Sequence, residues 1–134
     1  TSRGLGDVYK RQMLAGINAL AAAEAMTMGE RLGVSPDILY EVISTSTGRS
    51  YIFETSNPMP DVCSTSPANN KFKPGFMAKL MLKDLRLSQA AAQDAKTSTP
   101  LGAAANAAFQ QLIDSGFGDL DTSSIIKVIK PESK

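Results

Sequence analysis

Apolar and polar positions along most of this chain recur at the three- and four-residue spacing of α-helices. The pattern is clearest over residues 13–32, where the apolar residues at this spacing are Met13, Ile17, Leu20, Ala21, Met28 and Leu32. Many other residues of this segment are alanine, which has the highest helix propensity. Gly33 follows, and glycine is the residue that most often terminates a helix. We therefore predict a long helix over residues 13–32.

Capping residues and apolar spacing predict further helices, over residues 36–46, 50–56, 76–96, 100–115 and 123–129. Ser35-Pro36 and Thr99-Pro100 open two of them, and Asp121 or Thr122 caps the last. Residues 57–75 hold four prolines and Asn69-Asn70, which indicates a long ordered loop in which we expect the asparagines to order the backbone. Strand-like alternation never exceeds four residues. The predicted fold class is all-α, a bundle of about five or six helices around a long central helix.

The predicted helix over residues 76–96 has two apolar sides. At 100° per residue, Phe76, Leu80 and Lys83 share one stripe, while Met81, Leu82 and Leu85 lie opposite. A helix of this kind is usually packed between other helices, so we expect it at the centre of the bundle. Lys83 then has two interpretations: its stem covers apolar surface while the ammonium reaches water, or it lines a cleft and meets a polar or anionic ligand. Asp84 leaves the stripe and could anchor a neighbouring loop.

Composition excludes several classes of function. The 14 Lys and Arg against 13 Asp and Glu give a formal charge of +1, so we predict neither a nucleic-acid nor a membrane-surface partner. No run of 18 apolar residues is present that could span a membrane. The chain lacks histidine and has one cysteine, Cys63, which rules out an internal disulfide and the common histidine-dependent nucleophiles. We predict no metal site.

The first twelve residues differ from the rest. Residues 1–12 (TSRGLGDVYKRQ) are basic, show no apolar period and resemble the translated linker sequence that heads fragments assembled from short reads. We interpret residues 1–12 as a non-native or disordered leader. The domain is then residues 13–134.

Four sequence blocks in order resemble one enzyme family. FMAKLMLKDLRLSQA, residues 76–90, is similar to the "F…L…KDL.LA" signature of the β-hydroxyacid dehydrogenases. Three further blocks narrow the resemblance to the 3-hydroxyisobutyrate dehydrogenase branch: AEAMTMGERLGV at 23–34, STGRS within 45–50, and NPMPDV followed by SPANNKF within 57–72. Together the blocks cover essentially all of residues 13–134.

The resemblance implies an enzyme with an N-terminal Rossmann domain that binds NAD and an all-helical C-terminal domain, as in 6-phosphogluconate dehydrogenase-like enzymes. Such an enzyme oxidises 3-hydroxyisobutyrate to methylmalonate semialdehyde in valine breakdown. This chain would be the helical domain alone, because it has no G-x-G-x-x-G motif after a strand. Its expected partners are the missing Rossmann domain, a small hydroxy-acid substrate and further copies in a homo-oligomer.

Two other interpretations remain at this point: the same domain of a sibling such as a tartronate semialdehyde reductase, or a non-enzymatic helical oligomerisation module. For the enzyme, the expected compartment is the bacterial cytoplasm or the mitochondrial matrix, of which we prefer the cytoplasm.

The resemblance also implies roles for individual residues. The family's catalytic lysine, in a G-x-x-x-K-x-x-N-N run, falls on Val8, and its two asparagines fall on Arg11 and Gln12, so no catalytic residue is transferred. Lys10 is two residues out of register. Lys83 is the predicted cofactor-binding residue for NAD. The further residues expected to line the cleft are Phe76, Asp84 and Arg49.

Overall fold

The computed structural model describes residues 2–131, with side chains for residue 8 and residues 10–131. It contains six α-helices in this range: α1 (Ser2–Arg31), α2 (Pro36–Ser44), α3 (Tyr51–Thr55), α4 (Ala78–Asp94), α5 (Pro100–Asp114) and α6 (Ile126–Ile129). Two 3₁₀ turns, η1 (Pro67–Asn70) and η2 (Thr122–Ile125), complete the described elements. No strand occurs in this part of the chain, where Met77 and Asp121 form one isolated bridge. The all-α prediction is confirmed.

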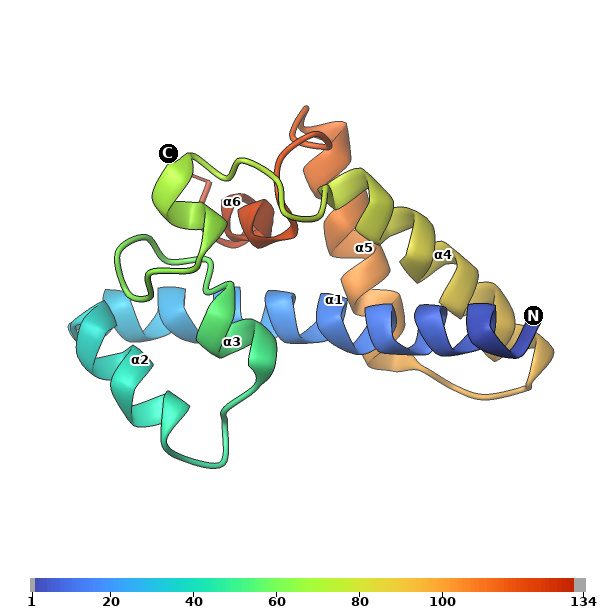
Figure 1. The fold of residues 1–134 in the computed structure, drawn as a ribbon, viewed down its shortest axis with the longest axis horizontal. Helices are drawn as coiled ribbons and strands as arrows, with labels where there is room; N and C mark the ends of the chain where they lie inside the picture. The colour runs from blue at the N-terminus through green and yellow to red at the C-terminus, as the bar shows by residue number, and fades with distance from the viewer. Residues whose placement is uncertain (1, 132–134) are drawn as a thin grey trace.

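The long central helix of the bundle is α1. In Figure 1, α4 and α5 cross over the N-terminal half of α1, while α2 and α3 lie beside its other half. The inward face of α1 carries Ala19, Ala22, Ala23 and Met26, each at most 4% exposed. Alanine side chains allow short distances between helix axes, so several elements can pack on one helix.

The central position predicted for the helix over 76–96 is wrong. In the structure this helix is α4, and its residues Met81, Leu82 and Leu85 are buried against the bundle. The opposite stripe faces outward, with Leu80 42% exposed and Lys83 exposed. The prediction that this segment is a helix with two apolar sides was thus correct. Only one of the two sides is buried against other residues of this chain.

The helical backbone of α1 begins at Ser2 and continues without a break through residues 2–12. The interpretation of residues 1–12 as a non-native or disordered leader stays a prediction.

The predicted helix ends are largely confirmed. Gly33 and Gly116 follow α1 and α5 with φ of +92° and +95°, values that favour glycine. Ser35 stands at the start of α2 as predicted, but its hydroxyl makes no capping bond.

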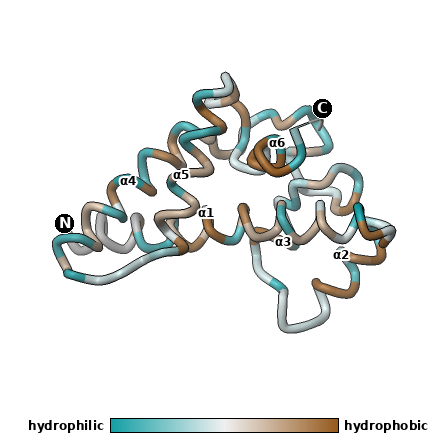
Figure 2. The backbone as a smooth tube through the Cα atoms, turned by 180° about the vertical axis from the view of Figure 1, so that it is seen from behind, coloured by the Kyte–Doolittle hydropathy of each residue, from teal (hydrophilic) through white to brown (hydrophobic). Residues whose placement is uncertain are grey.

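Hydropathy follows the packing. Figure 2 shows hydrophobic residues gathered on α1, α2 and α6, while most connecting segments are neutral or hydrophilic. Within the described residues, no helix has both the length and the apolar character needed to cross a bilayer.

Candidate functional site

A cavity of about 450 Å³ lies between α1, α3, the loop before α4 and the turn before α6. We call it the central cavity. Its lining residues come from four separate parts of the chain: Gln12, Ala15, Ala19, Ile52, Ser56, Thr65, Pro67, Gly75, Phe76, Met81, Asp121, Thr122 and Ser123. Its volume lies within the usual range for small-molecule sites.

The long loop on one side of the cavity is held by two asparagines. Asn57 is fully buried; its Nδ2 donates to the carbonyl of Phe53 at 3.2 Å and its Oδ1 accepts from the amide of Met59 at 2.9 Å. Asn69 Oδ1 accepts from the amide of Asp61 at 2.6 Å, and Asn69 Nδ2 donates to the carbonyl of Cys63 at 2.6 Å. The predicted ordering role of Asn69 is confirmed.

Phe76 is fixed in the cavity wall by its own backbone. Its N–H donates to Asp121 Oδ1 at 2.9 Å. Its carbonyl accepts from the backbone N–H of Thr122 and from Thr122 Oγ1, both at 2.8 Å. Phe76, predicted as a cleft residue, therefore lies at the central cavity, which residues of α1, α4 and the turn before α6 line together.

Asp121 is the residue on which this wall depends. It is 4% exposed, and its Oδ1 also accepts from the amide of Gly75 at 3.0 Å. Its Oδ2 accepts from the amide of Ser123 at 2.9 Å and from Ser123 Oγ at 2.6 Å. The sequence predicted Asp121 only as a candidate cap of a helix over residues 123–129, and in the structure it caps η2, the 3₁₀ turn that leads into α6. Its second set of partners lies 45 and 46 residues away, beyond the reach of local patterns.

Lys83 and Asp84 do not line the central cavity. Neither side chain makes a hydrogen bond or ion pair with any residue that the structure describes, so the loop-anchoring role considered for Asp84 is filled by Asp121 instead. By contrast, Lys79, one turn earlier on α4, pairs with Asp119 at 2.7 Å. The ammonium of Lys83 is thus available on the outer face of α4.

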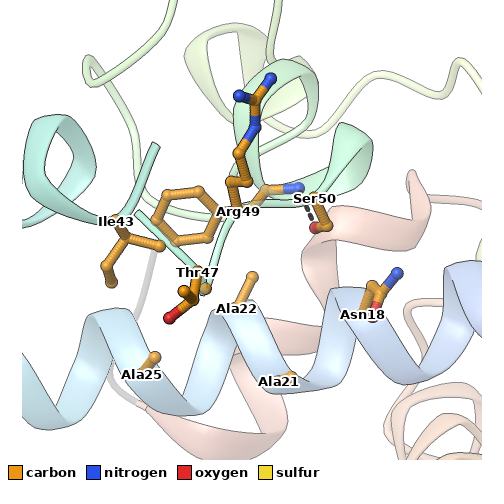
Figure 3. A pocket seen from close by; sticks show the side chains of 10 residues that line it. Asn18, Ala21, Ala22, Ala25, Ile43, Thr47, Arg49 and Ser50 are labelled. Atoms are coloured by element: carbon orange, nitrogen blue, oxygen red, sulfur yellow. Dashed lines mark hydrogen bonds between the residues drawn. The ribbon is translucent and has the colours of Figure 1, made fainter. Parts of the chain in front are cut away.

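Arg49 lies at a different cavity, of about 390 Å³, whose floor is made by Ala21, Ala22 and Ala25 of α1. Figure 3 shows its side chain extending away from that floor. Its Nε lies 3.5 Å from Glu54 Oε1, and its side chain is 64% exposed. The structure therefore does not bring Arg49 together with Phe76.

The α2–α3 corner beside Arg49 is held by Tyr40. Its ring stacks on Phe53 with a centroid distance of 5.6 Å, and its hydroxyl donates to the carbonyl of Glu54 at 2.5 Å. Burial raises the pKa of this phenol above its usual value of 10.0, which keeps the donor proton in place.

The motif positions at the start of the chain adjoin the central cavity. Val8, Arg11 and Gln12 line a further hollow of about 560 Å³, with Tyr51 opposite. Gln12 lines both this hollow and the central cavity. Val8, the position at which the resemblance places the family's catalytic lysine, is therefore about one helical turn from Gln12, which lines the central cavity.

Chemically, the described wall of the central cavity can enclose and orient a small ligand. Asp121 is its one ionisable lining residue, and both carboxylate oxygens already accept hydrogen bonds. No group of three potential metal-ligating side chains occurs among the residues described.

Comparison with known proteins shows which sequences and structures this chain is similar to. Residues 4–129 match a family described as "NAD-binding of NADP-dependent 3-hydroxyisobutyrate dehydrogenase". The chain is 35% identical to the mitochondrial 3-hydroxyisobutyrate dehydrogenase of Drosophila melanogaster, over 96% of this chain and 40% of that protein. It is 37% identical to an NAD-dependent L-serine dehydrogenase of Pseudomonas aeruginosa, over 96% of this chain and 44% of that protein.

A solved structure shares the fold. It is the 3-hydroxyisobutyrate dehydrogenase of Mycobacterium tuberculosis with L-serine, which matches with a TM-score of 0.88 and 35% identity over 92% of this chain and 42% of that one. The chain thus spans about two fifths of the length of the curated relatives it matches. From the family match over residues 4–129 and these relatives, the chain belongs to the 3-hydroxyisobutyrate dehydrogenase family of β-hydroxyacid dehydrogenases, enzymes that use NAD or NADP.

Proposed function

We propose that this chain is the C-terminal helical domain of an NAD-dependent 3-hydroxyisobutyrate dehydrogenase, inactive when alone. The observation that carries the proposal is the central cavity, which joins Phe76 of the family signature to the motif positions ending at Gln12. The chain's share of its relatives' length, 40% for the Drosophila enzyme, leaves room for the Rossmann domain that would bind most of the cofactor.

The surroundings of Lys83 suit a cofactor contact. Its ammonium is exposed and makes no ion pair with a described residue, and Leu80 beside it is 42% exposed. A free cation next to exposed apolar surface can meet a ligand that carries both a ring and polar groups. NAD, when bound, accepts the hydride from the substrate carbon.

The residues of this chain would bind and shield the reactants. Phe76 and Met81 supply apolar walls that exclude water from the central cavity, and Gln12 supplies an amide that can hydrogen-bond a hydroxyl or carboxylate. The proton relay would need the family's lysine, for which Val8 stands here. The chain therefore contributes binding and orientation, while the proton-transfer group comes from outside it.

The substrate class follows from the cavity and the relatives. A cavity of about 450 Å³ with few polar groups fits a small hydroxy acid. Relatives are named for 3-hydroxyisobutyrate and for L-serine, so both belong in a substrate comparison. We propose 3-hydroxyisobutyrate because three of the four sequence blocks narrow the resemblance to that branch.

The first test of the proposed function is the coding sequence upstream of Met13. We expect a continuous reading frame with G-x-x-x-K-x-x-N-N at the junction and a Rossmann motif further upstream. A start codon or unrelated coding sequence there would contradict the proposal and favour a free-standing helical module.

Lys83→Ala in the full-length enzyme should raise the KM for NAD about tenfold, the effect of losing one charge-assisted contact. The free energy of unfolding should not change, because the side chain is exposed. Initial rates at varied NAD concentration measure the KM. The matched control is Arg86→Ala on the same helix, since the Arg86 guanidinium is already bonded to Gln110 of α5. An unchanged KM for Lys83→Ala would remove Lys83 from the cofactor site.

A further inference from the structure

The segment that leads to Phe76 is strained. Lys71 and Phe72 have φ of +54° and +60° in succession, in the left-handed region that bulky side chains rarely adopt. Such conformations persist where the surrounding structure over-determines them, and they gather at functional sites. Here the strained pair comes directly before the cavity wall.

Contacts from the C-terminal part of the chain hold this segment at both ends. Phe72 is 1% exposed, and Lys127 Nζ lies 5.2 Å from its ring centroid. The carbonyl of Phe72 accepts from the amide of Asp121 at 2.9 Å. At the other end, Phe76 has its N–H bonded to Asp121 and its carbonyl bonded twice to Thr122. Residues 72–76 are thus clamped by residues 121–122.

The hydroxyl of Thr122 is the part of this clamp that the helix cap does not need. Asp121, not Thr122, caps η2 through its side chain. Thr122 Oγ1 instead donates to Phe76, 46 residues earlier, and Thr122 itself is 9% exposed at the cavity. This hydrogen bond therefore links the turn to Phe76 and is not part of the cap of η2.

We infer that Thr122 is a positioning residue for the hydroxy-acid substrate: its hydroxyl holds Phe76 and the strained segment 72–76 in place as a wall of the central cavity. This inference rests on the proposed function, in which that cavity takes the substrate. Lys83, outside the cavity, serves the cofactor. The two residues should therefore affect different Michaelis constants.

The kinetic test uses the full-length enzyme with Thr122→Val, which keeps the side-chain shape and removes the donor. We expect the KM for 3-hydroxyisobutyrate to rise about fivefold, the effect of one hydrogen bond, and the KM for NAD to stay within about twofold. Thr122→Ser should restore the substrate KM. Thr45→Val is the matched control, because Thr45 Oγ1 also donates to a carbonyl, that of Glu41 at 3.0 Å, on an exposed turn away from the cavity.

Hydrogen exchange on the 134-residue chain gives a second readout that needs no activity. In Thr122→Val, the amides of Gly75 and Phe76, which donate to Asp121, should exchange about tenfold faster, while those of α5 keep their rates. An unchanged exchange rate overturns the clamp. Faster exchange with an unchanged substrate KM overturns the positioning role and leaves a structural one. A wild-type enzyme that oxidises no hydroxy acid refutes the proposed function instead, and exchange still decides whether Thr122 holds Phe76.

Discussion

Replacing Asp121 with alanine should lower the free energy of unfolding by about 3 kcal/mol or more. The buried carboxylate accepts four hydrogen bonds, from the amides of Gly75, Phe76 and Ser123 and from the Ser123 hydroxyl. Alanine would leave these donors without a partner in a part of the molecule where Asp121 is 4% exposed. Urea unfolding followed by circular dichroism measures the difference.

Asp119→Ala is the matched control for this prediction. Asp119 lies two residues earlier, its side chain is 81% exposed, and its ion pair with Lys79 is at the surface. Such a pair contributes about 1 kcal/mol at most, so this variant should unfold nearly as the wild type does. Equal losses in the two variants would show that the bonds of Asp121 do not hold the segment before α4.

Leu85→Ala should also cost about 3 kcal/mol or more, because it opens a cavity where α4 meets α1. Leu85 is fully buried, and a Cβ placed on Gly16 of α1 would lie 3.3 Å from one of its methyl carbons. The two helices are therefore close together at this point. Neighbouring side chains could fill the space left by the Leu85 side chain only if the helices moved.

The control for Leu85→Ala is the same substitution at Leu80 of the same helix. Leu80 is 42% exposed on the opposite stripe, so its truncation should cost less than about 1 kcal/mol. Urea unfolding of both variants, fitted with one common m-value, compares their free energies of unfolding directly. A larger loss at Leu80 than at Leu85 would reverse the assignment of the buried face of α4.

The helices could be predicted because their signals are local. Alanine content and apolar spacing mark α1, and glycines at φ of +92° and +95° mark the ends of α1 and α5. The exposure of Leu80 and Lys83 could not be predicted in the same way. Periodicity shows that a face is apolar, but it does not show whether this chain or another part of a protein covers it.

The site was predictable only in part. Phe76 was predicted from the family signature to line the cleft; it lines the central cavity of this chain, and its role in the cleft of the whole enzyme stays a prediction. Its anchors were missed because Asp121 and Thr122 act on it across 45 and 46 residues. The left-handed backbone at Lys71 and Phe72 also has no local signal, since neither residue type favours it. Tertiary contacts, not local preference, determine this part of the site.

The continuity of α1 limits how this family member can vary. The helix presents Gln12 and Ala15 to the central cavity, and further along it packs Gly29 against Leu39 of α2. Inserting one residue between these points would turn one end by about 100° and shift it by about 1.5 Å relative to the other. An insertion directly before Ala19 would turn the buried Ala19 and Ala23 together relative to Gln12 and Ala15. We therefore expect substitutions on the outer face of α1 to be tolerated and single-residue insertions or deletions within it to be destabilising.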